Sequence, residues 1–262
     1  MFFSGADKEV VVKTAIVIPA RYASQRLPGK PLLRATGKYL IQHVYERACQ
    51  ARSADEVIVA TDDPRIAAAV KSFGGRVALT RADHASGTDR VAEVAGTLDA
   101  DILMNLQGDE PLIEPASLDL LPRLMDLDPE ADVATLATPI RSLDQWRDPN
   151  CVKVVCDARG RALYFSRSPI PFVRDGVPEL SAEPPRFLQH LGLYAYRRDF
   201  LTQLAALPPE PLEQLEKLEQ LRVLALGRRI RVGIVRHAAA GVDTPEDYER
   251  FVQMYRESRK AA

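Results

Sequence analysis

The pattern of hydrophobic and polar residues divides the first half of the chain into alternating strands and helices. Apolar runs of five or six residues, typical of buried parallel strands, alternate with segments that carry apolar residues every three or four positions. This alternation predicts an α/β fold, a mostly parallel sheet with helices on both faces. The predicted strands are 14–19, 56–61, 76–80, 101–106 and 133–138, and the predicted helices are 40–51, 65–73, 91–98 and 115–127.

The pattern changes after residue 151. Residues 152–156 and 162–166 read as two strands of a hairpin around a four-residue turn. A proline-rich excursion then runs to residue 185, and residues 187–196 form another predicted strand. We therefore expect residues 152–211 to form a smaller, partly antiparallel lobe. It would lie against an α/β core made of residues 1–151 and 212–262, in one continuous structural unit.

A stripe of leucines follows the lobe. Because leucines recur there every three residues, we expect one amphipathic helix that ends near Gly227 and packs its leucines on the core. Residues 231–235 form the last predicted strand. Thr244, Pro245 and Asp247 have the spacing of a capping box that opens the final helix. The leucines of the stripe are Leu212, Leu215, Leu218, Leu221 and Leu224.

Composition narrows the class of protein. The 262 residues carry a net charge of −1 without a run of like charges, so nothing indicates a nucleic-acid partner. No apolar stretch reaches the ~18 residues that a membrane helix needs. Cys49, Cys151 and Cys156 lack the spacing of a metal site or of a disulfide framework. We expect a cytoplasmic protein that does not insert into a membrane.

Three cations follow the first predicted strand. Arg21, Arg26 and Lys30 lie within ten residues, beside the turn-forming Pro28 and Gly29. In open α/β sheets, ligands bind at the carboxyl ends of the strands. Three spaced cations there suit a multiply charged anion such as a triphosphate. The alternative is an ordinary solvated basic loop.

Carboxylates and a helix start follow other predicted strands. Asp109 comes directly after strand 101–106, where a metal ligand and an aspartate of an ordinary turn both fit. Asp243 stands outside the cap of the last helix and is a second candidate metal ligand. Ser86 and Asp89 have capping-box spacing, which suits a simple helix start and also leaves backbone N–H groups facing an anion.

Eight segments, in order between residues 14 and 251, match one known family of enzymes. In these segments the chain closely resembles the 3-deoxy-manno-octulosonate (Kdo) cytidylyltransferases. The matching segments are 18–32, 59–62, 80–90, 105–111, 162–167, 190–194, 211–222 and 241–247. The first reads Ile-Pro-Ala-Arg-Tyr-Ala-Ser through Arg-Leu-Pro-Gly-Lys-Pro-Leu.

The resemblance implies a Rossmann-like nucleotidyltransferase fold and a homodimer. The implied reaction joins CTP and Kdo, with Mg²⁺, to give CMP-Kdo and pyrophosphate for lipopolysaccharide biosynthesis. The core would then bind the nucleotide, and residues 152–211 would contribute the sugar-binding and dimerisation lobe.

The resemblance also implies roles for individual residues of this chain. The residues that hold the triphosphate and support catalysis would be Arg21, Arg26, Lys30 and Asp109. The nucleotide site would further include Ala20, Ser24, Arg81, Ser86 and Gln107. The Mg²⁺ ligands would be Asp109 and Asp243. The sugar-acid site would include Arg167, His190, Tyr194, Glu219 and Gln220.

Several alternatives remain at this point. A cytidylyltransferase for 8-amino-Kdo or for a sialic or related nonulosonic acid would share the first loop and Asp109. A non-catalytic nucleotide-binding regulator predicts a lost metal carboxylate, whereas Asp109 and Asp243 are both present. A nicotinamide dehydrogenase is disfavoured because no G-x-G-x-x-G follows a predicted strand. A P-loop is disfavoured because Lys30 is followed by Pro31.

Overall fold

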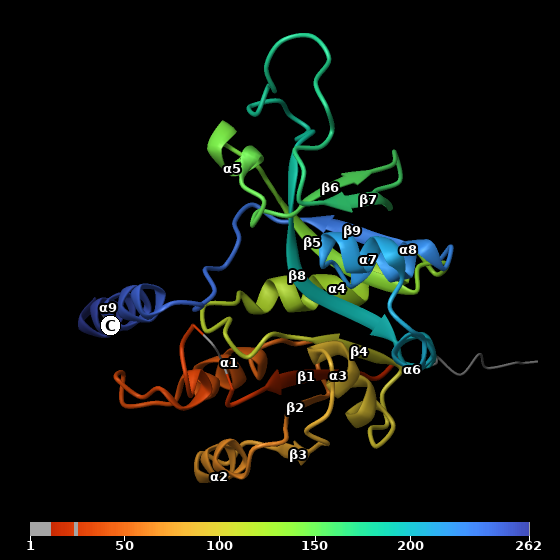
Figure 1. Cartoon of the computed structure of the whole chain (residues 1–262). Helices are drawn as coiled ribbons and strands as arrows, with labels where there is room; N and C mark the ends of the chain where they lie inside the picture. Colours follow the sequence, from red (N-terminus) through yellow and green to blue (C-terminus); the bar gives the residue numbers. More distant parts are fainter. Residues whose placement is uncertain (1–11, 24–25, 262) are drawn as a thin grey trace, which may run out of the picture.

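A single twisted sheet forms the centre of the computed structural model, which describes residues 12–23 and 26–261 (Figure 1). Nine strands of this described part belong to the sheet, and seven follow one another in hydrogen-bonded order. That order is β3 (Val77–Leu79), β2 (Glu56–Thr61), β1 (Thr14–Ala20), β4 (Ile102–Asn105), β8 (Leu188–Arg197), β5 (Val133–Pro139) and β9 (Ile230–Ile234). The hairpin of β6 (Lys153–Cys156) and β7 (Ala162–Ser166) joins through β6 to β8.

Strand β8 runs against the direction of the other six strands in that order. It pairs antiparallel with β4 on one side and with β5 on the other, whereas the pairs β1–β2, β1–β4, β2–β3 and β5–β9 are parallel. The predicted hairpin is confirmed, with Val154 opposite Phe165. The sheet is continuous through the segment expected to form the lobe, because β8 lies inside it. The boundaries at residues 151 and 212 stay a prediction.

Helices cover both faces of the sheet, which confirms the predicted fold class. Alternate residues of β1 face opposite layers: Ala15 and Val17 belong to the cluster with α3 and α6, and Ile16 and Ile18 to the cluster with α1, α2 and α4. The helices are α1 (Leu40–Ala48), α2 (Pro64–Ser72), α3 (Gly87–Ala95), α4 (Pro115–Leu127), α5 (Leu143–Arg147), α6 (Arg198–Ala206), α7 (Pro211–Glu216), α8 (Gln220–Ala225) and α9 (Pro245–Ala261). A continuous apolar run with no polar face explains why every residue of β1 is buried.

The helix caps expected from the sequence are present. Ser86 accepts a hydrogen bond from the Asp89 backbone N–H and Asp89 accepts one from Ser86, so a reciprocal capping box opens α3. Thr244 and Asp247 exchange the same pair of bonds at α9. Such caps satisfy N–H groups that the first helical turn leaves without partners.

The prediction of one continuous leucine helix is wrong. Helix α7 ends at Glu216, Lys217 adopts the left-handed conformation with φ 55°, and α8 starts at Gln220. The turn redirects the stripe, so Leu215 is exposed while Leu218 is buried in the core. Because a helix has 3.6 residues per turn, leucines that recur every three residues do not stay on one face of it. The helix ends instead, and a second helix continues in a new direction.

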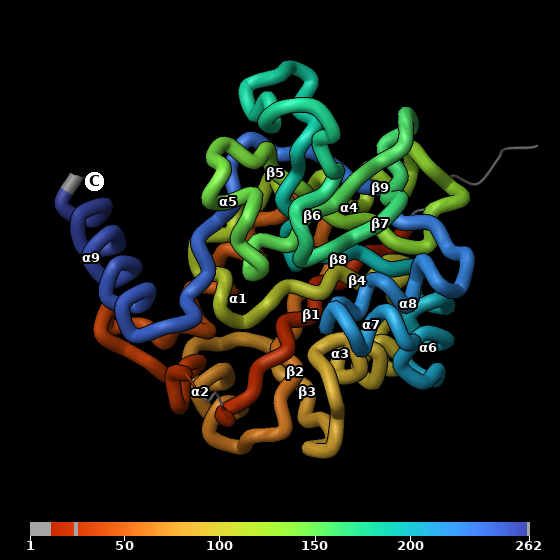
Figure 2. The backbone as a smooth tube through the Cα atoms, turned by 45° about the horizontal axis from the view of Figure 1, so that its top comes forward, coloured from red at the N-terminus to blue at the C-terminus, as the bar shows by residue number. Residues whose placement is uncertain are grey.

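Helix α9 lies beside the segment that follows β1, at one side of the molecule in both views (Figures 1 and 2). Its Phe251 and Val252 form a small apolar cluster with Leu27, Leu40 and Val242. The extended connection from β9 to α9 therefore returns along the carboxyl edge of the sheet. This path brings the start of α9 to the loop predicted to bind an anion.

Among residues 12–23 and 26–261, no helix is both long and apolar enough to span a bilayer. All three cysteines are free thiols.

Candidate functional site

The candidate site lies where parallel strands end at one edge of the sheet. Ala20 at the end of β1 pairs with Thr61 at the end of β2, and Val17 pairs with Asn105 at the end of β4. The loops that carry Arg21 and Gln107 therefore start side by side. Ala20 itself is buried, and Ser24 lies outside the described residues.

The side chain of Lys30 contacts both predicted metal ligands, Asp109 and Asp243. Its Nζ lies 2.6 Å from Oδ2 of Asp109 and 3.2 Å from Oδ1 of Asp243, and it also donates to the Val242 carbonyl at 3.0 Å. Gly29, with φ 67°, turns the chain into the short 3₁₀ helix η1 (Lys30–Leu32) that presents this side chain. The first loop, the β4 end and the start of α9 thus meet at one ammonium group.

Arg26 joins the same cluster, with Nη2 3.3 Å from Oδ1 of Asp243. Its guanidinium and the Asp243 carboxylate are both largely solvent-exposed, so the pair itself adds little stability. Its location matters more, because Arg26 and Lys30 place two positive charges beside Asp109 and Asp243. Two of the three predicted cations therefore converge on the two predicted metal ligands.

Glu110 is an acidic residue of this cluster that the sequence reasoning missed. The pKa of its carboxyl is raised to about 7, chiefly by burial and in addition by the nearby charges of Asp109 and Asp243, with Lys30 opposing the shift. A side chain on Gly241 would lie 3.2 Å from Oε1 of Glu110, so the connection to α9 passes close to this carboxyl. The adjacent Asp-Glu pair after β4 was the sequence signal.

The donor set fits a hard divalent cation such as Mg²⁺. Asp109 and Asp243 offer carboxylate oxygens that already converge on one positive charge, and Asp109 is partly open to solvent. No group of three or more His, Cys, Asp or Glu that could hold a metal occurs among residues 12–23 and 26–261. Mg²⁺ is usually held by one or two carboxylates together with water and substrate phosphates, so two carboxylates suffice.

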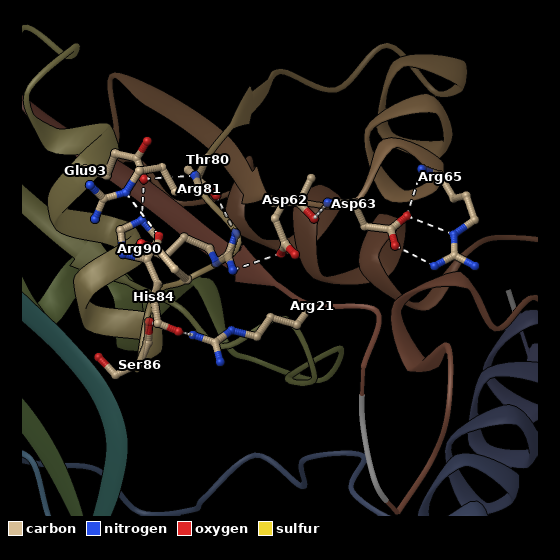
Figure 3. A network of polar contacts seen from close by, with 12 residues as sticks. Arg21, Asp62, Asp63, Arg65, Thr80, Arg81, His84, Ser86, Arg90 and Glu93 are labelled. Atoms are coloured by element: carbon tan, nitrogen blue, oxygen red, sulfur yellow. Dashed lines mark hydrogen bonds and ion pairs between the residues drawn. The ribbon is translucent and has the colours of Figure 1, made fainter.

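The third cation of the first loop points elsewhere. Nη2 of Arg21 donates to the carbonyls of His84 (2.7 Å) and Ser86 (3.0 Å), as Figure 3 shows. Arg21 therefore joins the β1 loop to the start of α3. Arg81, on the same connection, forms an exposed ion pair with Asp83 at 3.2 Å.

Gln107 and the α3 start are neighbours. A side chain on Gly87 would meet Pro19 at 3.4 Å and Oε1 of Gln107 at 3.9 Å, so Ser86 and Gly87 pass close to both. Nε2 of Gln107 donates to Asn105 at 3.4 Å. The structure thus brings Arg21, Ser86 and Gln107 to one part of the edge.

Arg90 lies behind these loops and was not singled out from the sequence. The side chain is completely buried, contacts the Thr80 hydroxyl, and places Nη2 2.9 Å from Oδ1 of Asp62 (Figure 3). Burial lowers the pKa of the guanidinium, and Asp62 opposes this shift. Arg90 links α3 to the ends of β2 and β3. Its position inside the matched segment 80–90 was the only sequence signal.

A cavity of about 510 Å³ lies beside the cluster and collects five of the predicted site residues. Burial lowers the pKa of His190 to about 3, so its imidazole is neutral at physiological pH. Its Nε2 lies 3.0 Å from the Thr135 hydroxyl. The rings of His190 and Tyr194 are 5.4 Å apart, and burial raises the Tyr194 pKa. The five residues are Gln107, His190, Tyr194, Gln220 and Asp243.

Glu219 and Arg167 do not line this cavity. Glu219 accepts a hydrogen bond from the Thr88 hydroxyl at 2.7 Å and lines a second cavity of about 730 Å³ together with Arg81 and Ser86. Nε of Arg167 donates to the Glu216 carbonyl at 2.7 Å. The residues predicted for the sugar acid are therefore divided between the 510 Å³ cavity, its neighbour and the α7–α8 junction, and their roles stay predictions.

Comparisons with known proteins agree with this arrangement. The cytidylyltransferase family matches residues 15–230. Two 3-deoxy-manno-octulosonate cytidylyltransferases, of Syntrophotalea carbinolica and Syntrophobacter fumaroxidans, are 54% and 55% identical to this chain. These alignments cover 89% and 90% of this chain and 95% and 94% of the relatives.

Solved structures give the same result. A structure of CMP:2-keto-3-deoxy-manno-octonic acid synthetase complexed with CTP has 51% identity and a TM-score of 0.87, covering 94% of this chain and 99% of the other. A cytidylyltransferase structure from Leptospira borgpetersenii, at 19% identity and a TM-score of 0.62, covers 92% of this chain and 85% of the other and shares the fold. Fold and site together define a nucleotidyltransferase. More narrowly, the chain belongs to the cytidylyltransferase family, among the 3-deoxy-manno-octulosonate cytidylyltransferases.

Proposed function

We propose that the protein transfers the cytidylyl group of CTP to Kdo, giving CMP-Kdo and pyrophosphate. The observation that carries this is the identity of more than half of the aligned residues with Kdo cytidylyltransferases along nearly their whole length. In the reaction, the anomeric hydroxyl oxygen of Kdo forms a bond to the α-phosphorus of CTP. The bond from that phosphorus to the bridging oxygen breaks, pyrophosphate leaves, and the hydroxyl proton passes to solvent.

Residues of the first loop would hold the triphosphate. Lys30 and Arg26 lie at the cluster, and their charges offset the negative charge that builds on the leaving pyrophosphate. Arg21 would contact the triphosphate where the loop after β1 meets the start of α3, since its side chain extends toward Ser86. Phosphoryl-type transfer depends mainly on such positioning and charge stabilisation.

Asp109 and Asp243 would hold Mg²⁺. The support is their convergence on one point and the open side of Asp109. When bound there, the ion supplies charge neutralisation at phosphate oxygens and orients them. Lys30 must then exchange its carboxylate contacts for contacts with phosphate.

The two substrates would lie on either side of this cluster. For the cytidine we propose the region of Ala20, Ser24, Arg81, Ser86 and Gln107. For Kdo we propose the 510 Å³ cavity with His190, Tyr194 and Gln220. Glu219 and Arg167 would contribute from the neighbouring cavity and from the α7–α8 junction. The neutral imidazole of His190 suits hydrogen bonding to sugar hydroxyls.

The proposal extends to a homodimer in the cytoplasm that supplies lipopolysaccharide biosynthesis. Support for a dimer comes from apolar side chains on the hairpin and α7, where Leu163 is 61% and Leu215 is 80% exposed. Large apolar side chains with this exposure are candidate contacts of a protein interface. Sedimentation equilibrium measures the mass directly, and a monomer at micromolar concentration would refute the dimer.

Pyrophosphate release tests the reaction. The purified protein is assayed with Mg²⁺ and CTP, UTP or ATP, each combined with Kdo, 8-amino-Kdo or a sialic acid. We expect the fastest release with CTP and Kdo, and loss of release when EDTA removes the metal. Preference for 8-amino-Kdo or a sialic acid would assign the sugar differently. No release with CTP and any of the three sugars would overturn the proposal.

A further inference from the structure

The junction between α7 and α8 places a strained residue directly before two predicted sugar-site residues. Lys217, with φ 55° and ψ 48°, is the non-glycine residue with positive φ in the described part of the chain. For an L-residue this conformation is unfavourable, because Cβ comes too close to the following carbonyl oxygen. Glu219 and Gln220 follow within three positions. Contacts around Lys217 must therefore determine where these two side chains point.

The carboxylate of Glu216 makes the first of these contacts, with the end of β7. Its Oε1 accepts a hydrogen bond from the Ser166 hydroxyl at 2.6 Å, and its Oε2 accepts one from the Arg167 backbone N–H at 2.9 Å. Both carboxylate oxygens of Glu216 thus bind residues at the end of β7, about fifty positions away in the sequence. Charge-assisted hydrogen bonds of this kind are roughly twice as strong as neutral ones.

The side chain of Arg167 makes the return contacts. Its Nε donates to the Glu216 carbonyl at 2.7 Å, Nη2 to the Lys217 carbonyl at 3.4 Å, and Nη1 to the Pro149 carbonyl at 2.9 Å. Carbonyls at a helix end have no helical partners, and a cation there is favourable. Each of the two residues therefore uses its side chain to bind the backbone of the other. The Glu216 carboxylate binds the Arg167 N–H, and the Arg167 guanidinium binds the Glu216 carbonyl.

A buried lysine fixes the β7 side of this pair. Nζ of Lys153 donates to the carbonyls of Arg167 (2.6 Å), Cys151 (2.6 Å) and Asp148 (2.9 Å), and the residue is completely buried. All three ammonium protons are then satisfied. The Arg167 backbone is held from one side by Lys153 and from the other by Glu216.

Beyond the turn, Gln220 presents an unpartnered donor to the cavity. The residue is 6% exposed and lines the 510 Å³ cavity with His190 and Tyr194. Its Nε2 is buried and makes no hydrogen bond to any described residue. A buried N–H group without an acceptor destabilises the protein, and a ligand oxygen in the cavity would remove that cost.

We propose that Glu216 is a positioning residue for recognition of the sugar acid. It does not line the cavity. It fixes the α7–α8 turn against β7, and the turn aims Gln220 into the cavity. The inference rests on the proposed function, because the sugar acid is the ligand of that cavity.

The test compares steady-state kinetics of the wild type, Glu216→Gln and the matched surface control Glu249→Gln on α9. A glutamine offers one acceptor oxygen in place of two, and its NH₂ group faces either Ser166 or the Arg167 N–H. We expect KM for Kdo to rise about tenfold in Glu216→Gln, the equivalent of losing one hydrogen bond of ~1.4 kcal/mol. We expect KM for CTP to change less than about twofold, because the nucleotide lies on the other side of the cluster. Glu249→Gln should match the wild type.

A second variant keeps the test decisive if Glu216→Gln does not fold. Ser166→Ala removes one of the two contacts and should raise KM for Kdo about threefold with KM for CTP unchanged. A KM for Kdo that stays at the wild-type value in the folded variants would overturn the inference. Equal rises in both KM values would also overturn it, because they indicate a general structural role. Absence of turnover in the wild type would refute the proposed function instead.

Discussion

The ammonium nitrogen of Lys30 lies 2.6 Å from Oδ2 of Asp109, although 79 positions separate the two residues. Asp243 adds a second carboxylate at 3.2 Å, so one positive charge faces two negative charges. The Lys30 side chain is 13% exposed, so these contacts are made in a partly dehydrated place where charge interactions are stronger than in water. The two carboxylates suit a divalent cation, and the lysine suits the phosphates that accompany it.

Asp109→Asn should nearly abolish turnover. A neutral amide is a far weaker Mg²⁺ ligand than a carboxylate, and the variant leaves Lys30 with one acidic partner fewer. We expect kcat to fall by at least about 100-fold, as for the loss of one preorganised electrostatic group. Pyrophosphate release measures it, with the exposed Asp126→Asn on α4 as the control. A variant that keeps most of its activity would remove Asp109 from the metal site.

Lys30→Ala should lower kcat more than it weakens binding of Kdo. The ammonium lies at the carboxylate cluster, whereas the proposed Kdo cavity is lined by His190 and Tyr194. Loss of one charge that stabilises the leaving pyrophosphate is expected to cost about 100-fold in kcat. Saturation kinetics with Kdo at fixed CTP separate the two constants. An unchanged kcat would show that Lys30 does not act in the transition state.

Gln220→Leu should make the protein more stable and a poorer enzyme. The substitution removes a buried Nε2 that has no acceptor among the described residues, so the unfolding free energy should rise by about 1 kcal/mol. The same substitution removes a donor from the Kdo cavity, so KM for Kdo should rise. Urea unfolding and kinetics are measured on one preparation. A stability loss together with normal Kdo kinetics would contradict the assignment of this donor to a ligand.

Glu213→Gln should destabilise the fold. The guanidinium of Arg222 binds the Glu213 carboxylate through Nε at 2.7 Å and Nη2 at 2.5 Å, with both side chains about 90% buried. Removing one partner leaves a buried charge uncompensated, which costs about 3–5 kcal/mol. Urea denaturation measures the change. The double variant Glu213→Gln/Arg222→Met should lose less than the two single variants combined, and simple additivity would argue against a coupled pair.

Stability should fall as the pH drops below about 6.5. Burial lowers the pKa of His43 from 6.5 to about 4, with Glu46 opposing and Lys38 adding to the shift. Between these values the unfolded chain binds a proton that the folded chain does not, so acidification favours unfolding. The unfolding free energy then changes by at most ~1.4 kcal/mol per pH unit for this histidine.

His43→Gln isolates this contribution. The ring packs edge-on against Phe251 and Tyr255 of α9, at centroid distances of 5.0 and 4.7 Å. Urea unfolding at pH 7 and pH 5 gives the slope for wild type and variant. We expect a shallower pH dependence in the variant. Identical slopes would show that His43 titrates normally in the folded protein.

Much of the fold could be predicted because its signals are local. The apolar run at residues 14–19 and the Ser86–Asp89 cap depend on neighbours in the sequence, and both are confirmed. The place of β8 could not be predicted in this way. Its partners β4 and β5 lie far away in the chain, and the apolar residues of a strand do not indicate with which other strands it pairs. The turn at Lys217 was missed because distant side chains, Ser166 and Arg167, hold it.

The candidate site shows the same division. Residues after strand ends, such as Asp109, could be proposed from position and chemistry alone. Glu110, Arg90 and Glu216 were missed, since their importance comes from burial and from partners on other elements. The leucine pattern also gives no sign that the guanidinium of Arg222 binds the Glu213 carboxylate. Which residues form such pairs depends on the tertiary structure. The spacing of residues along one helix gives no information about it.

The antiparallel strand β8 has a consequence for synthesis of the chain on the ribosome. Strands β4 and β5 are complete by residue 139, but they do not pair with each other, and β8 fills the space between them. In a nascent chain that ends before residue 188, the β4 edge and the β5 edge that β8 later covers are therefore open, and each can pair with another chain. Emergence of β8 closes both edges in one event. The middle of the sheet is thus completed late, by a strand that is synthesised about fifty residues after β5 and about eighty residues after β4.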